Sequence, residues 1–75
     1  MEERVLKILR QNNGEILQYQ GQNMIEDGII DSLDMINIVS DLENEFGIVI
    51  MPEDVNGKNF ATKETVIRLI QQISI

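Results

Sequence analysis

The sequence predicts a small all-α domain, a four-helix bundle built from three principal helices and one short third helix. Two observations lead to this fold class. Apolar residues recur with the period of an α-helix rather than with the strict alternation of a strand. Capping residues, five glycines and one proline divide the chain into helical segments. With 75 residues there is room for one domain, so we expect residues 1–75 to fold as a single unit.

The first helix is expected from about Glu2 to Gln11. Acidic residues stand at its start and Arg10 at its end, which is the order that the helix dipole favours. Gly14 and the two asparagines before it should end the helix. The apolar stripe of this helix consists of Val5, Leu6, Ile8 and Leu9.

Residues 15–31 are expected to form a long connection, because polar residues and glycines interrupt any helical period. The segment from Glu15 to Tyr19 allows a short helical turn. A loop this long inside a small domain is uncommon unless it carries function. The apolar residues that should hold the connection against the core are Ile16, Leu17, Met24, Ile25, Ile29 and Ile30.

The second helix carries the clearest signals. Asp31 is a favourable N-cap residue, and Asp34 three residues later is placed as in a capping box. The helix should run to Glu45 or Phe46 and end at Gly47. Its predicted core face is the arc formed by Met35, Ile38, Val39, Leu42 and Phe46.

The last third of the chain predicts one short and one longer helix. After an extended stretch over residues 48–50, Pro52 suits the first position of the short third helix, which Gly57 and the asparagine before it should end. Thr62 is expected to cap the last helix, with Thr65 rather than a glutamate at the third position. The apolar stripe of that helix consists of Val66, Ile67, Leu69, Ile70 and Ile73.

The formal net charge of the chain is −7, and the acidic residues are concentrated in the middle of the sequence. No lysine or arginine occurs between Arg10 and Lys58. Such a charge repels nucleic acids and anionic lipids and attracts basic protein surfaces. The simpler interpretation, which composition alone favours, is that these acidic residues keep a small domain soluble.

Several function classes find no support in the sequence. Without cysteine or histidine there are no disulfides, no usual zinc ligands and no common catalytic base. The acidic spacing from Asp27 to Asp34 does not match a calcium loop, and no pattern pairs Ser32 with Lys58 or Lys63 as nucleophile and base. We therefore expect neither a metal site nor an enzyme. No secretion signal or membrane-spanning stretch is recognisable, so we expect a cytoplasmic protein.

Three residues near the start of the second predicted helix are not explained by the packing of a helical bundle. Leu33 and Ile36 fall outside the core arc, so they are either isolated surface residues or anchors for a partner. Ser32 lies at the first or second helical position, where free N–H groups and the helix dipole suit a phosphate. A serine at this place is also a common cap. From these residues alone, both interpretations of each feature stay open.

Four stretches occur in a set order and spacing. Residues 27–34 have the sequence DGIIDSLD, 41–48 DLENEFGI, 52–55 PEDV and 59–62 NFAT. Together they resemble the acyl carrier protein family, whose attachment site contains Asp-Ser-Leu and whose second helix ends on Leu-Glu-x-x-Phe-x-Ile. The resemblance covers the chain from about Ile25 onward.

The resemblance implies an acyl-carrier-protein-like bundle and a carrier function. Ser32 would hold 4′-phosphopantetheine, added from coenzyme A by a separate, magnesium-dependent phosphopantetheinyl transferase. The terminal thiol of this group would carry acyl or aminoacyl intermediates as thioesters for fatty-acid, polyketide or related biosynthesis. We expect a monomer whose acidic face meets basic docking patches on the loading and transferring enzymes. The residues expected on this face are Asp31, Leu33, Asp34, Ile36, Asp41 and Glu43.

Two positions depart from the fatty-acid carriers that the chain resembles. Asn37 stands where those proteins usually have an acidic residue, and Ser40 stands where they often have an apolar one. Residues 59–62 are also similar to D-alanyl carrier proteins, which pair with an adenylating ligase, so an aminoacyl carrier is an alternative. An acidic interaction module without modification would use the same surface and is the alternative from another class.

Overall fold

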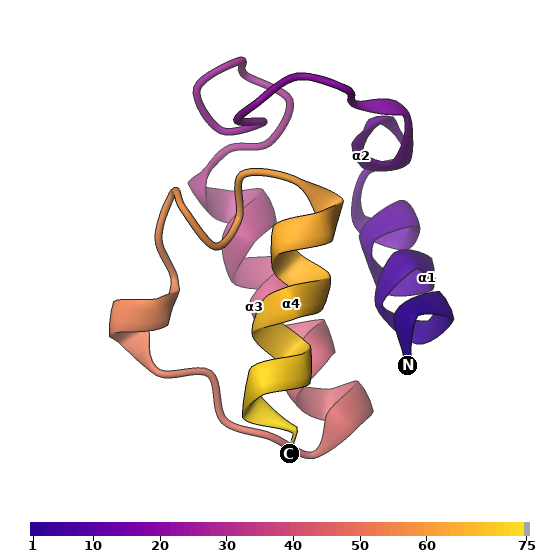
Figure 1. Ribbon diagram of the computed structural model, residues 1–75, viewed down its shortest axis with the longest axis vertical. Helices are drawn as coiled ribbons and strands as arrows, with labels where there is room; N and C mark the ends of the chain where they lie inside the picture. The colour runs from indigo at the N-terminus through magenta and orange to yellow at the C-terminus, as the bar shows by residue number, and fades with distance from the viewer. Residues whose placement is uncertain (75) are drawn as a thin grey trace.

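A computed structural model describes residues 1–74, and its regular elements are helical (Figure 1). The helices are α1 (Glu2–Asn12), α2 (Glu15–Gln18), α3 (Ser32–Phe46) and α4 (Lys63–Ile73), with a 3₁₀ turn, η1, at Pro52–Asp54. In Figure 1, α3 and α4 run in the same direction and α1 runs against both. The predicted all-α bundle is confirmed, since no strand occurs within residues 1–74.

α1 is the central packing element, because it contacts α2, α3 and α4. Its acidic first turn and its final Arg10 match the helix dipole as predicted. Leu6, from the predicted stripe, is half-buried against the core. The buried residues of α1 are Val5, Ile8 and Leu9.

Arg4 joins the start of α1 to the end of α3. Its Nε lies 2.7 Å from Glu45 Oε2, and its Nη2 donates to the carbonyl oxygen of Glu45 at 2.9 Å. The guanidinium also lies over the ring of Phe46, 4.5 Å from the ring centroid. This three-part contact fixes the antiparallel alignment of α1 and α3 at one end of the bundle.

The connection between α1 and α3 is packed onto the core, as the sequence predicts. The Met24 N–H donates to the carbonyl oxygen of Ala61 at 2.8 Å, which ties the loop to the segment before α4. The Met24 carbonyl oxygen in turn accepts hydrogen bonds from the N–H groups of Ile29 and Ile30. The buried residues of this connection, including α2, are Ile16, Met24 and Ile30.

Tyr19 organises the tip of this connection. Its hydroxyl donates to Asp27 Oδ2 at 2.6 Å and accepts from the Asn23 N–H at 2.7 Å. Gly21 lies so close to the ring that a Cβ at this position would overlap the Tyr19 hydroxyl. Partial burial and the hydrogen bond to Asp27 raise the pKa of Tyr19 above its usual value.

α3 begins and ends where the sequence predicts. Asp31 is its N-cap, and Gly47 ends it in the left-handed conformation with φ 62°. The predicted core arc of α3 is confirmed. Ile38 and Leu42 are buried, and the other three residues of the arc pack against the core with part of each side chain exposed. The half-buried residues of the arc are Met35, Val39 and Phe46.

The short third helix is a single 3₁₀ turn over Pro52–Asp54, and Val55 is its C-cap. Pro52 occupies its start as expected. The Asn56 side chain folds back over the end of this turn, with Nδ2 donating to the carbonyl oxygen of Glu53 at 2.8 Å. Asn56 therefore helps to end the short third helix, as predicted.

α4 completes the core. Thr62 and Thr65 form a reciprocal capping box at its start, as predicted from the spacing. Phe60, immediately before the cap, is fully buried. No helix in the described part of the chain is long and apolar enough to cross a membrane. The stripe residues that α4 buries are Val66, Ile67, Leu69 and Ile70, with Ile73 half-buried.

Candidate functional site

The N-terminus of α3 is closed by a complete capping box. Asp31 Oδ1 accepts the N–H of Asp34 at 2.9 Å, and Asp34 Oδ2 accepts the N–H of Asp31 at 3.2 Å. The two aspartates therefore satisfy each other's backbone donors, and no third side chain is needed to cap the helix.

Ser32 is the first residue of α3 and is exposed. The sequence left open whether this serine is a cap or a site, and the structure assigns the capping role to Asp31. The hydroxyl of Ser32 is thus not required for helix formation. The N–H groups of Ser32 and Leu33 belong to the first turn, where a helix offers no internal acceptor. Together with the helix dipole, they favour an anionic group attached at this place.

The chain approaches Ser32 along an anchored path. Ile30 is buried, 2% exposed, and lies only two residues before Ser32. The carbonyl oxygen of Ile29 accepts a hydrogen bond from Asn13 Nδ2 at 2.9 Å, and Gly28 makes the turn with φ 75°. The long connection therefore holds the start of α3 in place rather than leaving it to move as a free loop.

Two apolar side chains stand next to Ser32 on the outer side of α3. Leu33 and Ile36 are each 63% exposed, which confirms that they lie outside the core. Beside Ile36 a shallow groove of about 280 Å³ runs between α3 and the segment after η1. The groove is lined by Ile36, Val39, Ser40, Glu43 and Val55.

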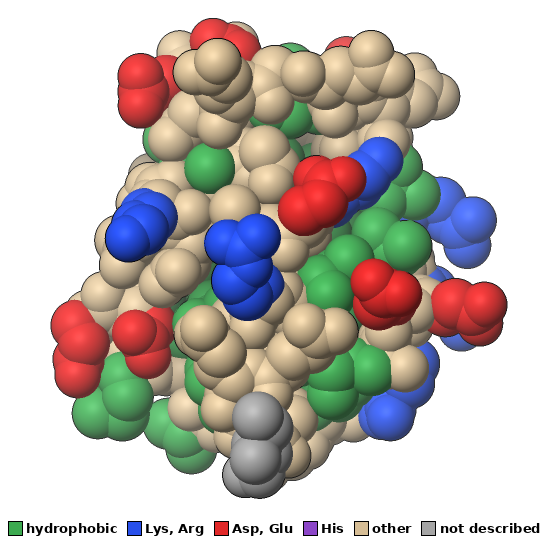
Figure 2. All heavy atoms as spheres, in the orientation of Figure 1, with side chains coloured by type: hydrophobic (Ala, Val, Ile, Leu, Met, Phe, Trp, Pro, Cys, Tyr) green, Lys and Arg blue, Asp and Glu red, His purple; other side chains and the backbone are tan. Residues whose placement is uncertain are grey.

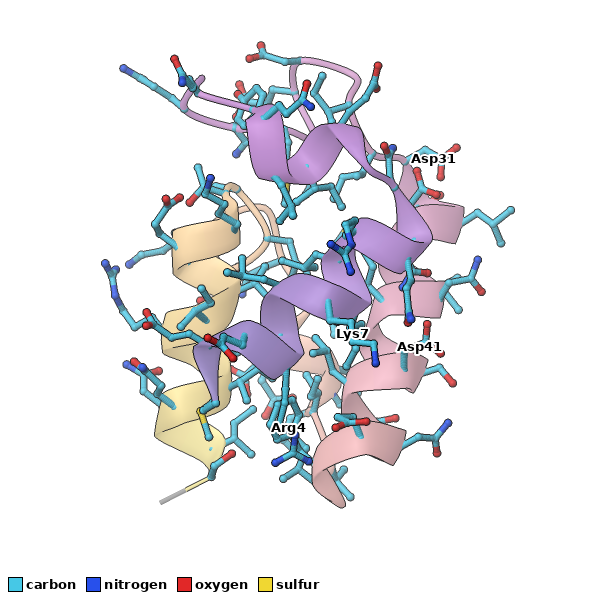
Figure 3. The ribbon with its side chains drawn as sticks, turned by 90° about the vertical axis from the view of Figure 1, so that its right-hand side faces the viewer. Arg4, Lys7, Asp31 and Asp41 are labelled. Carbon is cyan, nitrogen blue, oxygen red and sulfur yellow. The ribbon has the colours of Figure 1, made fainter. Side chains whose placement is uncertain are left out.

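The acidic residues predicted for the docking face already make hydrogen bonds within the protein. Asp41 accepts from Asn12 Nδ2 at 2.9 Å and lies part-way along α3 on the side toward α1, whereas Asp31 lies at the N-terminal end of the helix (Figure 3). Glu43 Oε2 accepts the N–H of Ile50 at 2.9 Å and so holds the chain that follows α3. Their roles in docking stay a prediction.

Sequence reasoning missed one wall of the groove beside Ile36. Val55 forms that wall, and Ser40 was noted only as a departure from a family pattern. The signal for Val55 was present, because it is a lone apolar residue between Asp54 and Asn56. Within residues 1–74, no group of three or more His, Cys, Asp or Glu side chains is arranged to hold a metal ion.

The family of the phosphopantetheine attachment site matches residues 4–73, nearly the whole chain. The chain belongs to this family. Proteins of the phosphopantetheine attachment family carry 4′-phosphopantetheine covalently on a serine, and such carrier domains interact with a transferase and with biosynthetic enzymes. Searches of curated proteins and of solved structures gave no significant match.

The residues at the start of α3 fit the group that this family carries. Of the three serines in the chain, Ser32 and Ser40 lie on α3 and Ser74 follows α4. Ser32 alone stands at a helix N-terminus, where the backbone favours a phosphate. Its hydroxyl is exposed to an approaching enzyme, and its backbone is fixed by the cap on one side and the buried Ile30 on the other.

Proposed function

We propose that this chain is a carrier protein that holds 4′-phosphopantetheine on Ser32 and presents acyl or aminoacyl thioesters to partner enzymes. The observation that supports it is the exposed Ser32 at the N-terminus of α3, free of the capping role that Asp31 takes. When attached, the group supplies a thiol that the chain itself lacks, since the sequence contains no cysteine.

The chain's own residues would position the attachment point. The Asp31–Asp34 box keeps the first turn of α3 folded, so the backbone N–H groups of Ser32 and Leu33 face outward near the phosphate. Ile30, buried in the core, prevents this turn from swinging away. Because the attachment point is rigid, only the cofactor arm would move, and the docking surface around Ser32 would keep one conformation.

The docking surface proposed for the transferase and the other partner enzymes is centred on Leu33 and Ile36. Their 63% exposure provides apolar anchors, and Asp31 is exposed beside them. Basic patches on a partner would be attracted by the net charge of −7 during encounter. The negative potential of this surface includes contributions from Asp34, Asp41 and Glu43, although their side chains also form hydrogen bonds within the protein.

An aminoacyl carrier that pairs with an adenylating ligase is the second candidate. Asn37 and Ser40 are both exposed on α3, so the two departures from the fatty-acid carriers lie where a partner can contact them. A partner selected for an acidic and an apolar residue at these positions would meet an amide and a hydroxyl instead. This difference favours a partner other than a fatty-acid synthase.

The proposed role includes no catalysis by the chain itself. Carrier domains of this family are generally not catalytic, and Lys63 donates its Nζ to the carbonyl oxygen of Leu17 at 2.7 Å rather than serving Ser32. We place the protein in the cytoplasm as a monomer, where coenzyme A and the partner enzymes would meet it.

Intact-mass spectrometry tests the proposal. The chain is incubated with coenzyme A, magnesium and a phosphopantetheinyl transferase of broad specificity. We expect a mass gain of one phosphopantetheine for the wild type and for Ser40→Ala, a matched control that removes the other serine of α3. Ser32→Ala should show no gain. A folded wild type that gains nothing would contradict the carrier function and leave the acidic interaction module as the better account.

A further inference from the structure

A second concave feature lies away from Ser32, on the face that α4 presents. It is a cavity of about 510 Å³ between α4 and the segment that follows η1. This volume is within the range of about 300–1,000 Å³ usual for small-molecule sites. The polar residues of its lining are Asn56, Lys58, Asn59, Thr65, Arg68 and Gln72, and Leu69 adds one apolar side chain.

One wall of this cavity is built by side chains that bond to the backbone. Asn56 Oδ1 accepts the N–H of Asn59 at 2.9 Å, and Asn59 Nδ2 donates to the carbonyl oxygen of Asp54 at 2.9 Å. The hydroxyl of Thr65 donates to the carbonyl oxygen of Asn59 at 2.8 Å. The first two bonds fold the segment on itself and the Thr65 bond ties it to α4, so the cavity does not depend on a free loop.

Two positive charges line the cavity without a partner of their own. Lys58 and Arg68 form no ion pair with any residue from 1 to 74, although Glu64 stands four positions before Arg68 on α4. Both side chains are exposed, and Lys and Arg side chains are prominent on this face in Figure 2. In a chain with a net charge of −7, this cavity has two cations and no acidic residue in its lining, whereas the groove beside Lys7 and Arg10 also contains Glu3.

We propose that this cavity binds a small molecule through an oxyanion group, a phosphate or a carboxylate, held by Lys58 and Arg68. Arg68 offers a planar fork of donors that suits an oxyanion, and Lys58 adds a second charge. Polyanions such as nucleic acids are disfavoured, because the overall negative charge of the protein repels them. The site is independent of Ser32 and of the carrier function. Affinity in the millimolar range is expected, because salt screens exposed charges.

The test is a titration of the ¹⁵N-labelled full chain, followed by the amide shifts in NMR spectra at constant ionic strength. Inorganic phosphate and succinate are the two probes, and sodium chloride provides the background. We expect saturable shifts at the amides of Asn59, Thr65 and Arg68 with at least one probe. The probe with the tighter saturation identifies whether phosphate or carboxylate is the preferred group.

Three variants make the result decisive. Lys58→Gln combined with Arg68→Gln should abolish the saturable shifts, whereas Lys7→Gln combined with Arg10→Gln, which removes two exposed cations from α1, should leave them unchanged. Ser32→Ala should also leave them unchanged, and the amides of Ser32 and Leu33 should not saturate together with those of this site, which separates it from phosphate bound by the backbone at the start of α3. Shifts that never saturate, that appear equally around Lys7, or that persist without Lys58 and Arg68 would overturn the proposal.

Discussion

Replacing Asp31 by alanine should destabilise the protein without touching the residue that we propose for modification. The substitution removes the acceptor for the Asp34 N–H, a hydrogen bond of 2.9 Å, and exposes the first turn of α3. Asp34 keeps its own bond to the backbone N–H of residue 31, so only half of the box is lost. Losing an N-cap side chain costs about 0.5–2 kcal/mol, and we expect roughly 1 kcal/mol here.

Unfolding in urea, followed by far-UV circular dichroism, measures this change. A loss of about 1 kcal/mol lowers the melting temperature of a domain of this size by about 4–8 °C, so a thermal scan gives an independent check. Asp31→Asn is the matched control, because an amide oxygen can still accept the Asp34 N–H. It should recover most of the lost stability.

The stability of Ser32→Ala, compared with that of Asp31→Ala, tests whether Asp31 rather than Ser32 caps α3. Since Ser32 is exposed and the cap belongs to Asp31, this variant should stay within about 0.5 kcal/mol of the wild type. If Ser32→Ala cost as much stability as Asp31→Ala, the serine would be a structural residue. The separation between cap and attachment point would then be incorrect.

Three further predictions concern the packing around the site. Arg4→Ala should lose about 1–2 kcal/mol, because an ion pair, a bond to a carbonyl and a cation–π contact disappear together, and high salt should reduce the difference. The pKa of Tyr19 is raised above 10.0, so its contribution to stability is complete below pH 10 and is lost as the pH rises through the raised value. Urea titrations should therefore show a steeper alkaline loss for the wild type than for Tyr19→Phe. Leu33→Ala or Ile36→Ala should weaken modification by the transferase with little change in stability, whereas Leu42→Ala, in the core, should cost about 2–5 kcal/mol of stability. Equal unfolding midpoints for Leu33→Ala, Ile36→Ala and Leu42→Ala would show that the assignment of core and surface residues on α3 is wrong.

The helix ends could be predicted from the sequence because they depend on local chemistry. Asp31 and Asp34 stand at the spacing of a capping box, and Gly47 supplies the left-handed residue that ends α3. Once the bounds of α3 are known, the helical period assigns each of its residues to a face of the helix. Leu33 and Ile36 fall on the face opposite the core residues, and both are exposed.

Contacts between distant segments could not be predicted in this way. Lys63 bonds to the carbonyl oxygen of Leu17 across 46 positions, and Asn12 bonds to Asp41 across 29. Such pairs depend on how the helices pack, and no local pattern indicates them. For the same reason the cavity beside α4 is visible only in the folded chain, because two segments separated in sequence form its walls.

Fragmentation of the modified protein in a mass spectrometer tests the central claim most directly, because it locates the added group on a residue. After treatment with the transferase, coenzyme A and magnesium, we predict that the phosphopantetheine is found on Ser32 and on no other residue. Its presence on Ser40 or Ser74, with Ser32 unmodified, would contradict the assignment of the attachment site while keeping the carrier function. The absence of any modified residue in the folded protein would contradict both.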